Sequence, residues 1–178
     1  MHTDFQLQPA DHQHLDRIMA IIDFAIASRK ADGSQQWQDG YPNRQTIEAD
    51  IHHKFAYILQ DREGQIAAYA AVIDEPEPAY EQLNTWLNSQ TYITIHRVAI
   101  APEFKGQGIA THIFHQIHEL AIQKGFQNIK VDTNFDNLPM LHILQKLQYT
   151  YCGEVYFRGS PRRAYQKVLN NINSASSC

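Results

Sequence analysis

The stretch HRVAIAPEFKGQGIATHIF, residues 96–114, determines how this chain folds. Its start belongs to an apolar run that predicts a central strand over residues 92–100, because apolar residues occupy both faces of that run. A helix is predicted to begin at Ile109, where apolar residues start to recur at helical spacing. Gly106 and Gly108 lie between the strand and the helix, where glycine lets backbone N–H groups approach a ligand closely.

The N-terminus of a helix attracts anions, so this loop is a candidate phosphate site. Two glycines before a helix can also form a simple turn. A P-loop is excluded because Gly108 is followed by Ile109 where that motif requires lysine. The dinucleotide fingerprint is an alternative, with Thr111 at its third position and Asp132 as the ribose-binding acid. Residues 101–105 argue against it, because they separate the strand from the glycines.

The rest of the sequence predicts a mixed α/β fold with a central, mostly antiparallel sheet and helices on both faces. A strand, helix and parallel strand unit lies at its centre, formed by residues 92–100, 109–125 and 128–133. The other expected elements are a strand at 4–8, helices at 11–32, 44–53 and 138–147, hairpins at 55–60 with 65–73 and at 150–157 with 162–169, and a helical turn or two within 74–90.

The length of 178 residues predicts one domain over residues 1–170 and a polar tail over 171–178. A net charge of -4 and 43% hydrophobic residues indicate a globular protein without a general attraction for nucleic acid or anionic membranes. The chain contains no apolar run near the length of a membrane span and starts with a polar segment, so we expect it in the cytoplasm. Cys152 and Cys178 are expected to be reduced, because two cysteines do not indicate a disulfide framework.

Three segments together resemble the cofactor-binding core of the GNAT superfamily of acyl-CoA-dependent N-acyltransferases. They are the opening stretch, then NIKVDT at residues 128–133 and NLPMLHILQKLQY at 137–149, about a third of the chain. The family motif is Arg or Gln, two variable residues, Gly, one variable residue and then Gly or Ala. Lys105 to Ala110 match this motif except at the first position, where lysine replaces Arg or Gln.

The resemblance implies an acetyl-CoA co-substrate and a parallel strand pair that splays to admit its pantetheine arm. Main-chain donors of the loop would hold the pyrophosphate, and Lys105 would add a positive charge. Asn137 would contact the cofactor or fix the neighbouring loop, although an ordinary helix cap is the alternative. The implied cofactor-binding residues are Val98, Ala99, Ile100, Lys105, Gly106, Gln107, Gly108, Ile109, Ala110, Thr111 and Asn137.

Acetyl transfer to an amine requires a base for the amine and a proton donor for the leaving thiolate. The family often supplies the donor as a tyrosine seven positions after the asparagine, but Leu144 occupies that position here. His96 is a candidate base because it interrupts the apolar strand near the implied thioester, and a buried hydrogen-bonded histidine is the alternative. Asp132 at the end of the next strand is the second candidate, with capping of local backbone as the alternative.

Aromatic residues in two loops are candidates for the acceptor pocket, or for anchoring those loops on the core. They are Trp37, Tyr41 and Trp86. Three histidines at 112, 115 and 118 recur every third residue, and we interpret them as a solvated helix face. No convincing ligand set accompanies them, so no metal is expected.

The sequence therefore predicts an N-acetyltransferase that transfers an acetyl group from acetyl-CoA to a primary amine of a small metabolite. One alternative is acetylation of a protein N-terminus or lysine, and another is a non-catalytic acyl-CoA-binding module. A homodimer is compatible with such a domain.

Overall fold

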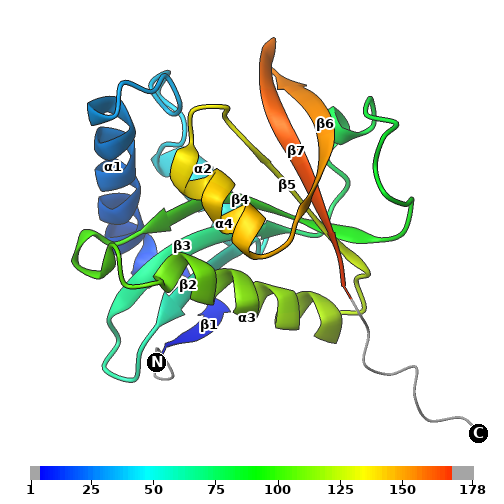
Figure 1. Ribbon diagram of the computed structural model, residues 1–178. Coiled ribbons are helices and arrows are strands. Elements are labelled where there is room, and N and C mark those ends of the chain that lie inside the picture. The colour runs from blue at the N-terminus through cyan, green and yellow to red at the C-terminus, as the bar shows by residue number, and fades with distance from the viewer. Residues whose placement is uncertain (1–4, 170–178) are drawn as a thin grey trace, which may run out of the picture. The chain divides into compact units, whose positions relative to one another are not determined.

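The computed structural model describes residues 5–169, which form seven strands and four α-helices together with short 3-10 helices (Figure 1). The strands are β1 (Gln6–Pro9), β2 (Ala56–Gln60), β3 (Ile66–Ile73), β4 (Tyr92–Ile100), β5 (Asn128–Thr133), β6 (Thr150–Phe157) and β7 (Ser160–Val168). The helices are α1 (Leu15–Ala31), α2 (Arg44–His52), α3 (Ile109–Gln123) and α4 (Leu138–Lys146). These bounds confirm the expected elements to within a few residues, and a 3-10 turn at Pro78–Tyr80 is the helical turn expected within 74–90.

The described chain divides into two compact units, which we call the first unit and the second unit. The first unit lies within Met1–Ile73 and Ile95–Gln116, and the second lies within Asp74–Thr94 and Ile117–Cys178. Both β4 and α3 run from one unit into the other. The interpretation of residues 1–170 as one domain stays a prediction, and the tail over 171–178, with Cys178, lies outside the described residues.

The strands follow the order β1-β2-β3-β4-β5-β7-β6. Strand β2 is antiparallel to β1 and β3, and β7 is antiparallel to β5 and β6. The exception is β4 with β5, which pair in parallel from Tyr92 opposite Asn128 to Thr94 opposite Lys130. A mixed, mostly antiparallel sheet with one parallel pair is therefore confirmed, because the helix α3 crossover between β4 and β5 permits parallel pairing.

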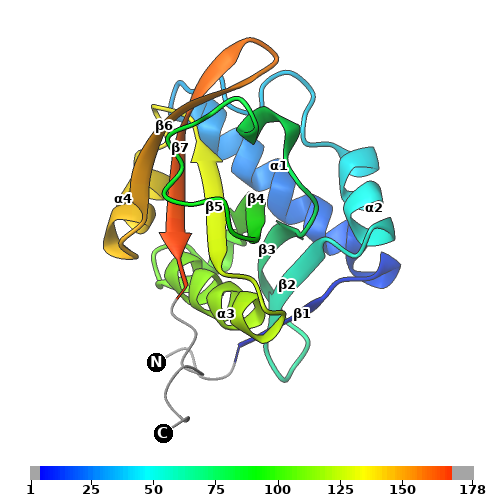
Figure 2. The same cartoon turned by 90° about the vertical axis from the view of Figure 1, so that its right-hand side faces the viewer.

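In the first unit, α1 and α2 pack on β2 and β3 (Figures 1 and 2). Their apolar faces bury Ile18 and Ile22 of α1 and Ile47 of α2 completely. Helix α1 follows a 3-10 turn capped by Asp11, whose side chain accepts a hydrogen bond from the Gln13 backbone N–H, and α2 begins at Asn43, which forms a capping box with Thr46. The caps and the apolar spacing together explain why the sequence signals located these helices closely.

In the second unit, the residues of β5 are buried on both faces, as expected of a strand covered on both sides. The β6–β7 hairpin lies beside β5, and α4 lies next to this hairpin in both views (Figures 1 and 2). Tyr80 packs with Val155 and Ala164 in a small buried cluster that closes one side of the unit. Cys152 is buried in β6 as a free thiol, as expected of a reduced cysteine.

The helix face with three histidines differs from the prediction of a solvated face. Only His115 is exposed. His118 is 9% exposed, and its Nε2 lies 2.8 Å from the hydroxyl oxygen of Tyr149. His112 contacts the carbonyl oxygen of Phe5 at 3.2 Å. The prediction failed because a histidine with a polar partner is tolerated in a buried position, and spacing along a helix does not reveal that partner.

The helices of the described chain include none that is both long enough and apolar enough to cross a membrane.

Gly153 lies at the register shift between Tyr151 and the rest of β6 and has a φ of 133°. A Cβ atom there would approach Leu83 Cδ1 to 2.9 Å and Thr85 Oγ1 to 3.2 Å. We predict that Gly153→Ala lowers the free energy of unfolding by about 2–3 kcal/mol, measured by urea denaturation. Gly159→Ala is the control, because Gly159 also has a positive φ but its Cβ would meet nothing within 4 Å. Equal losses in the two variants would contradict the role of crowding at Gly153.

Candidate functional site

The glycine loop connects β4 to α3 within the first unit. Gly106 has a φ of 78° and Gly108 a φ of 81°, a conformation that glycine adopts without strain. The backbone N–H of His112 donates to the carbonyl of Gly108 at 3.0 Å. The N–H groups of Ile109, Ala110 and Thr111 precede this first hydrogen bond of the helix, so helix geometry gives them no acceptor within α3. Such donors, together with the positive end of the helix dipole, form an arrangement that suits an anion.

Lys105 lies at the start of this loop and points toward α1. Its Nζ lies 3.3 Å from Ser28 Oγ and 5.9 Å from the centre of the Phe24 ring. These are weak contacts for an exposed ammonium, so the side chain has little to hold it in this position. The positive charge expected at the loop is thus present, but the contacts of the Lys105 ammonium do not fix its position relative to the loop.

Strand β4 contains a conformational irregularity at Arg97, whose φ is 54°. A non-glycine residue in this left-handed region costs on the order of 1–3 kcal/mol and persists only when its surroundings hold it. The strand therefore departs from regular geometry just before Val98, Ala99 and Ile100. Beyond them, the backbone N–H of Ala101 donates to the carbonyl of Ala67 on β3 at 2.9 Å.

The Arg97 side chain is held by a buried network from three other segments of the first unit. Its Nε lies 2.8 Å from Asp50 Oδ2 and its NH2 lies 2.6 Å from Asp50 Oδ1, a bidentate ion pair with α2. Its NH1 donates to the Tyr41 hydroxyl at 2.6 Å. The hydroxyl of Tyr69 on β3 donates to Asp50 Oδ2 at 2.5 Å. The two charged side chains are only 10% and 6% exposed, so these partners replace nearly all of their water.

The network fixes the protonation of its members. Burial raises the pKa of Tyr69 well above its ordinary value, and the neighbouring Asp50 carboxylate raises it further. Burial by itself lowers the pKa of Arg97, but Tyr41 and Asp50 outweigh burial and raise the pKa above its ordinary value. The guanidinium therefore stays charged and the Tyr69 phenol stays neutral at all moderate pH values.

The predicted base His96 precedes Arg97 on β4 and is partly buried. Val98 and Ile100 are also partly exposed, and Ala99 is 3% exposed. His96 and the segment from Val98 to Ile100 therefore belong to the first unit and flank the irregular residue. Their assignment to chemistry and to cofactor contact stays a prediction.

The second predicted base, Asp132, belongs to the second unit and is engaged in a buried network of its own. Its Oδ1 accepts a hydrogen bond of 2.7 Å from the Tyr80 hydroxyl, and its Oδ2 lies 3.5 Å from Arg162 NH1. Burial raises the pKa of Tyr80 well above its ordinary value, and Asp132 contributes to that increase. These contacts supply a structural reason for a carboxylate at this position, so a role in proton transfer stays a prediction.

Asn137 and Leu144 lie on α4 in the second unit. The Asn137 side chain accepts a hydrogen bond of 3.3 Å from the backbone N–H of Met140, as an N-cap does. The cap explains this residue locally, and its contact with a cofactor stays a prediction. Leu144 is fully buried, so it packs in the core where the family often has tyrosine.

The predicted acceptor residues lie in different surroundings. Trp37, with a φ of 63°, and Tyr41 belong to the loop before α2, where Tyr41 joins the Arg97 network. Trp86 belongs to the second unit, and its Nε1 donates to the carbonyl of Tyr80 at 2.9 Å. The centre of its ring lies 4.1 Å from the Nζ of Lys130. Burial lowers the pKa of this lysine. Anchoring thus accounts for Trp86, and substrate contact stays a prediction for all three.

Two functional neighbours, Asp50 and Tyr69, were not predicted from the sequence. Asp50 follows Ile47 by three residues and precedes Ile51, so it lies on the apolar face of the predicted helix. An acid at such a position was the signal in the sequence for a buried carboxylate. Tyr69 carries no such signal, because a tyrosine in an apolar strand is ordinary. Within residues 5–169 no group of three or more potential metal ligands occurs, and the expected absence of a metal stays a prediction.

We predict that Asp50→Ala lowers the free energy of unfolding by about 3–5 kcal/mol, because it leaves the Arg97 charge buried without its carboxylate. Urea denaturation measures the change. The control is Asp16→Ala, which breaks the exposed pair of Asp16 with Arg44 at 2.8 Å and should cost no more than about 1 kcal/mol. Similar losses in the two variants would show that the buried pair contributes no more than a surface pair.

Comparisons with known proteins agree with this arrangement. The model of the GNAT acetyltransferase family matches residues 22–149. A GNAT-family acetyltransferase from Streptococcus agalactiae 2603 is 39% identical over 92% of this chain and 95% of that chain, with a TM-score of 0.84. A search of curated proteins found no match.

Two further structures share the fold at lower identity. A GNAT-family acetyltransferase from Listeria monocytogenes 4b F2365 is 19% identical, covers 93% of this chain and 95% of that chain, and has a TM-score of 0.75. A phosphinothricin acetyltransferase from Sinorhizobium meliloti, solved in complex with acetyl-CoA, is 12% identical, covers 99% of this chain and 94% of that chain, and has a TM-score of 0.67. The family match covers more than half of the residues, and therefore this chain belongs to the GNAT acetyltransferase family.

Proposed function

We propose that the protein transfers an acetyl group from acetyl-CoA to a primary amine of a small metabolite. The observation that carries this proposal is the glycine loop at the start of α3, where two glycines with positive φ precede the unpaired N–H groups of a helix. Family membership supports an acyltransferase, and the acetyl-CoA complex of the S. meliloti protein supports the choice of donor.

The loop fits the pyrophosphate of acetyl-CoA in shape and in charge. A Cβ atom at Gly106 would meet nothing within 4 Å, so this glycine is required for its backbone conformation and not for space inside the protein. The N–H groups of Ile109, Ala110 and Thr111 would donate to phosphate oxygens, and Gln107 and Lys105 would line the loop. The main chain of Val98, Ala99 and Ile100 would bind the pantetheine arm, with Asn137 as a further contact.

The acceptor amine must lose a proton before it can attack the thioester. An amine with a pKa near 10 pays about 4 kcal/mol to be neutral at pH 7 unless a base accepts its proton. His96 is the base that we propose, because an imidazole titrates near neutral pH and belongs to the strand proposed to hold the donor. Asp132 is the second candidate. The coenzyme thiolate can leave without a tyrosine donor, because a thiol pKa near 8.5 makes it a tolerable leaving group.

The acceptor would be bound by aromatic side chains in two loops. Trp37, Tyr41 and Trp86 are the proposed substrate contacts, and aromatic side chains in loops suit a small amine with apolar parts. Acetylation of a protein N-terminus or lysine is the alternative reaction, and a non-catalytic acyl-CoA-binding module is the alternative of another class. Release of coenzyme thiol with panels of small amines and peptides separates the three, because a binding module would bind acetyl-CoA without turnover.

We predict that Gly108→Val weakens acetyl-CoA binding at least tenfold, about 1.4 kcal/mol, because a branched side chain would occupy the space that phosphate needs and would strain the backbone. Isothermal titration calorimetry measures the affinity. Gly33→Val is the control, since Gly33 has a similar φ of 78° at the end of α1, outside the loop. Unchanged affinity in a folded Gly108→Val protein would remove the loop from the donor site.

We predict that His96→Gln lowers kcat about a hundredfold and leaves the affinity for acetyl-CoA nearly unchanged, because glutamine keeps hydrogen bonding but cannot take a proton. The rate is followed against pH with an amine that the wild-type protein acetylates. His115→Gln is the control, since it removes an exposed histidine from α3. If His96 has only a structural role, thermal stability will fall while the rate of the folded enzyme keeps its wild-type pH profile.

A further inference from the structure

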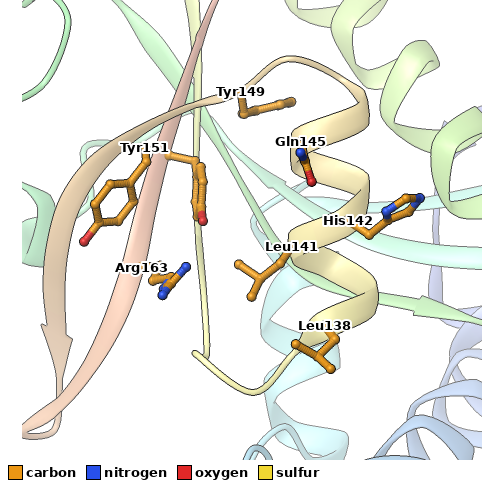
Figure 3. A pocket seen from close by; sticks show the side chains of 8 residues that line it. Leu138, Leu141, His142, Gln145, Tyr149, Tyr151 and Arg163 are labelled. Carbon is orange, nitrogen blue, oxygen red and sulfur yellow. The ribbon is translucent and has the colours of Figure 1, made fainter.

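The second unit contains a pocket of about 420 Å³ that none of the residues proposed for acetyl transfer lines. One wall is formed by α4 and the other by the β6–β7 hairpin (Figure 3). Its volume is within the range of small-molecule sites. The lining residues are Leu138, Leu141, His142, Gln145, Tyr149, Tyr151, Arg163 and Tyr165.

The aromatic part of the pocket is held in place by hydrogen bonding and ring contacts. Tyr149 is 7% exposed, and its hydroxyl lies 2.8 Å from the Nε2 of the buried His118. Burial raises the pKa of Tyr149 well above its ordinary value, so its phenol is neutral. Tyr151 and Tyr165 are cross-strand neighbours whose ring centres lie 5.5 Å apart. A flat apolar group could therefore contact preformed aromatic surface without ordering these side chains first.

Arg163 is the charged group of the pocket, and it points between Tyr151 and Leu141 (Figure 3). Its guanidinium carbon lies 5.0 Å from the centre of the Phe135 ring and 5.9 Å from that of Tyr151. Its Nε is buried and has no hydrogen-bond partner among the described residues, which also offer the guanidinium no ion pair. Glu154 lies opposite Arg163 in register, but its carboxylate is exposed and accepts a hydrogen bond from Tyr156 at 3.3 Å.

We propose that this pocket is an accessory binding site for a small aromatic carboxylate. A planar guanidinium binds a carboxylate through two parallel hydrogen bonds, and the two rings beside Arg163 hold it in orientation. The aromatic body of the ligand would lie against Tyr151 and Tyr165 on one side and the leucines of α4 on the other. An aromatic cation is disfavoured, because Arg163 would repel it and the pocket lining contains no acid.

The pocket is open, since Leu138 is 70% exposed and Tyr151 is 51% exposed. Binding is therefore expected to be weak, and a ligand of about a dozen non-hydrogen atoms should have a Kd of about 0.1–1 mM. A regulatory ligand at a millimolar cellular concentration needs no tighter site. The same exposed side chains could instead be covered by a second copy of the chain, and the experiment must separate these two cases.

The probe is indole-3-acetate, titrated into the full chain by NMR or calorimetry with coenzyme A present to occupy the proposed donor site. We expect saturable binding, with at least tenfold weaker binding of indole-3-ethanol, which lacks the charge, and none of tryptamine. Arg163→Gln should weaken indole-3-acetate binding at least tenfold, and Leu141→Glu should abolish it by placing a carboxylate in the pocket. Arg62→Gln, the same change on an exposed turn of the first unit, should leave it unaltered.

Three results would overturn the proposal. The first is the absence of saturation at ligand concentrations about tenfold above the expected Kd. The second is equal binding of the acid and the alcohol, or equal binding by wild-type and Arg163→Gln proteins. The third is an affinity for indole-3-acetate that falls as the protein concentration rises, together with dimers in sedimentation that the Leu141→Glu substitution separates. The pocket would then be an interface between two copies of the chain. None of these results depends on acetyl transfer, so the proposed function can stand or fail independently.

Discussion

The buried ion pair between Arg97 and Asp50 is the interaction on which the first unit depends. Arg97 has a backbone conformation that a regular strand would not adopt, and the cost of that conformation must be offset by its surroundings. The bidentate pair with Asp50, together with Tyr41 and Tyr69, supplies this offset from α2, the preceding loop and β3. Removal of any one partner would leave buried polar groups unsatisfied, so the irregularity in β4 and the positions of these segments are determined together.

The second unit also contains a buried carboxylate with polar partners, that of Asp132. Asp132 accepts a hydrogen bond from the phenol of Tyr80 and forms an ion pair with the guanidinium of Arg162, whose NH1 lies 3.5 Å from Asp132 Oδ2. Burial keeps both Tyr69 and Tyr80 neutral, and each therefore acts as a hydrogen-bond donor. Both carboxylates thus hold neighbouring side chains in place through hydrogen bonds and ion pairs.

The two proposed binding sites would use different parts of the chain for recognition. At the proposed donor site, at the start of α3, the donors would be backbone N–H groups, and lysine at position 105 would be tolerated because the conformation of the glycines, and not a particular side chain, would create the site. In the pocket of the second unit, Arg163 and the tyrosines would determine what binds, so single substitutions would alter its selectivity.

The sequence by itself determined the order and bounds of the elements, the parallel pairing around α3 and the glycine loop, because apolar period, caps and glycine conformation are local properties. Arg97 lies within the apolar run of β4, where a buried charge requires partners. Only the tertiary structure decided which partners, since Asp50 and Tyr69 come from segments far apart in the chain, and loop closure rather than local spacing brings them to Arg97. His118 was misjudged for the same reason: its spacing on α3 suggested solvent, and only folding placed the Tyr149 hydroxyl beside it.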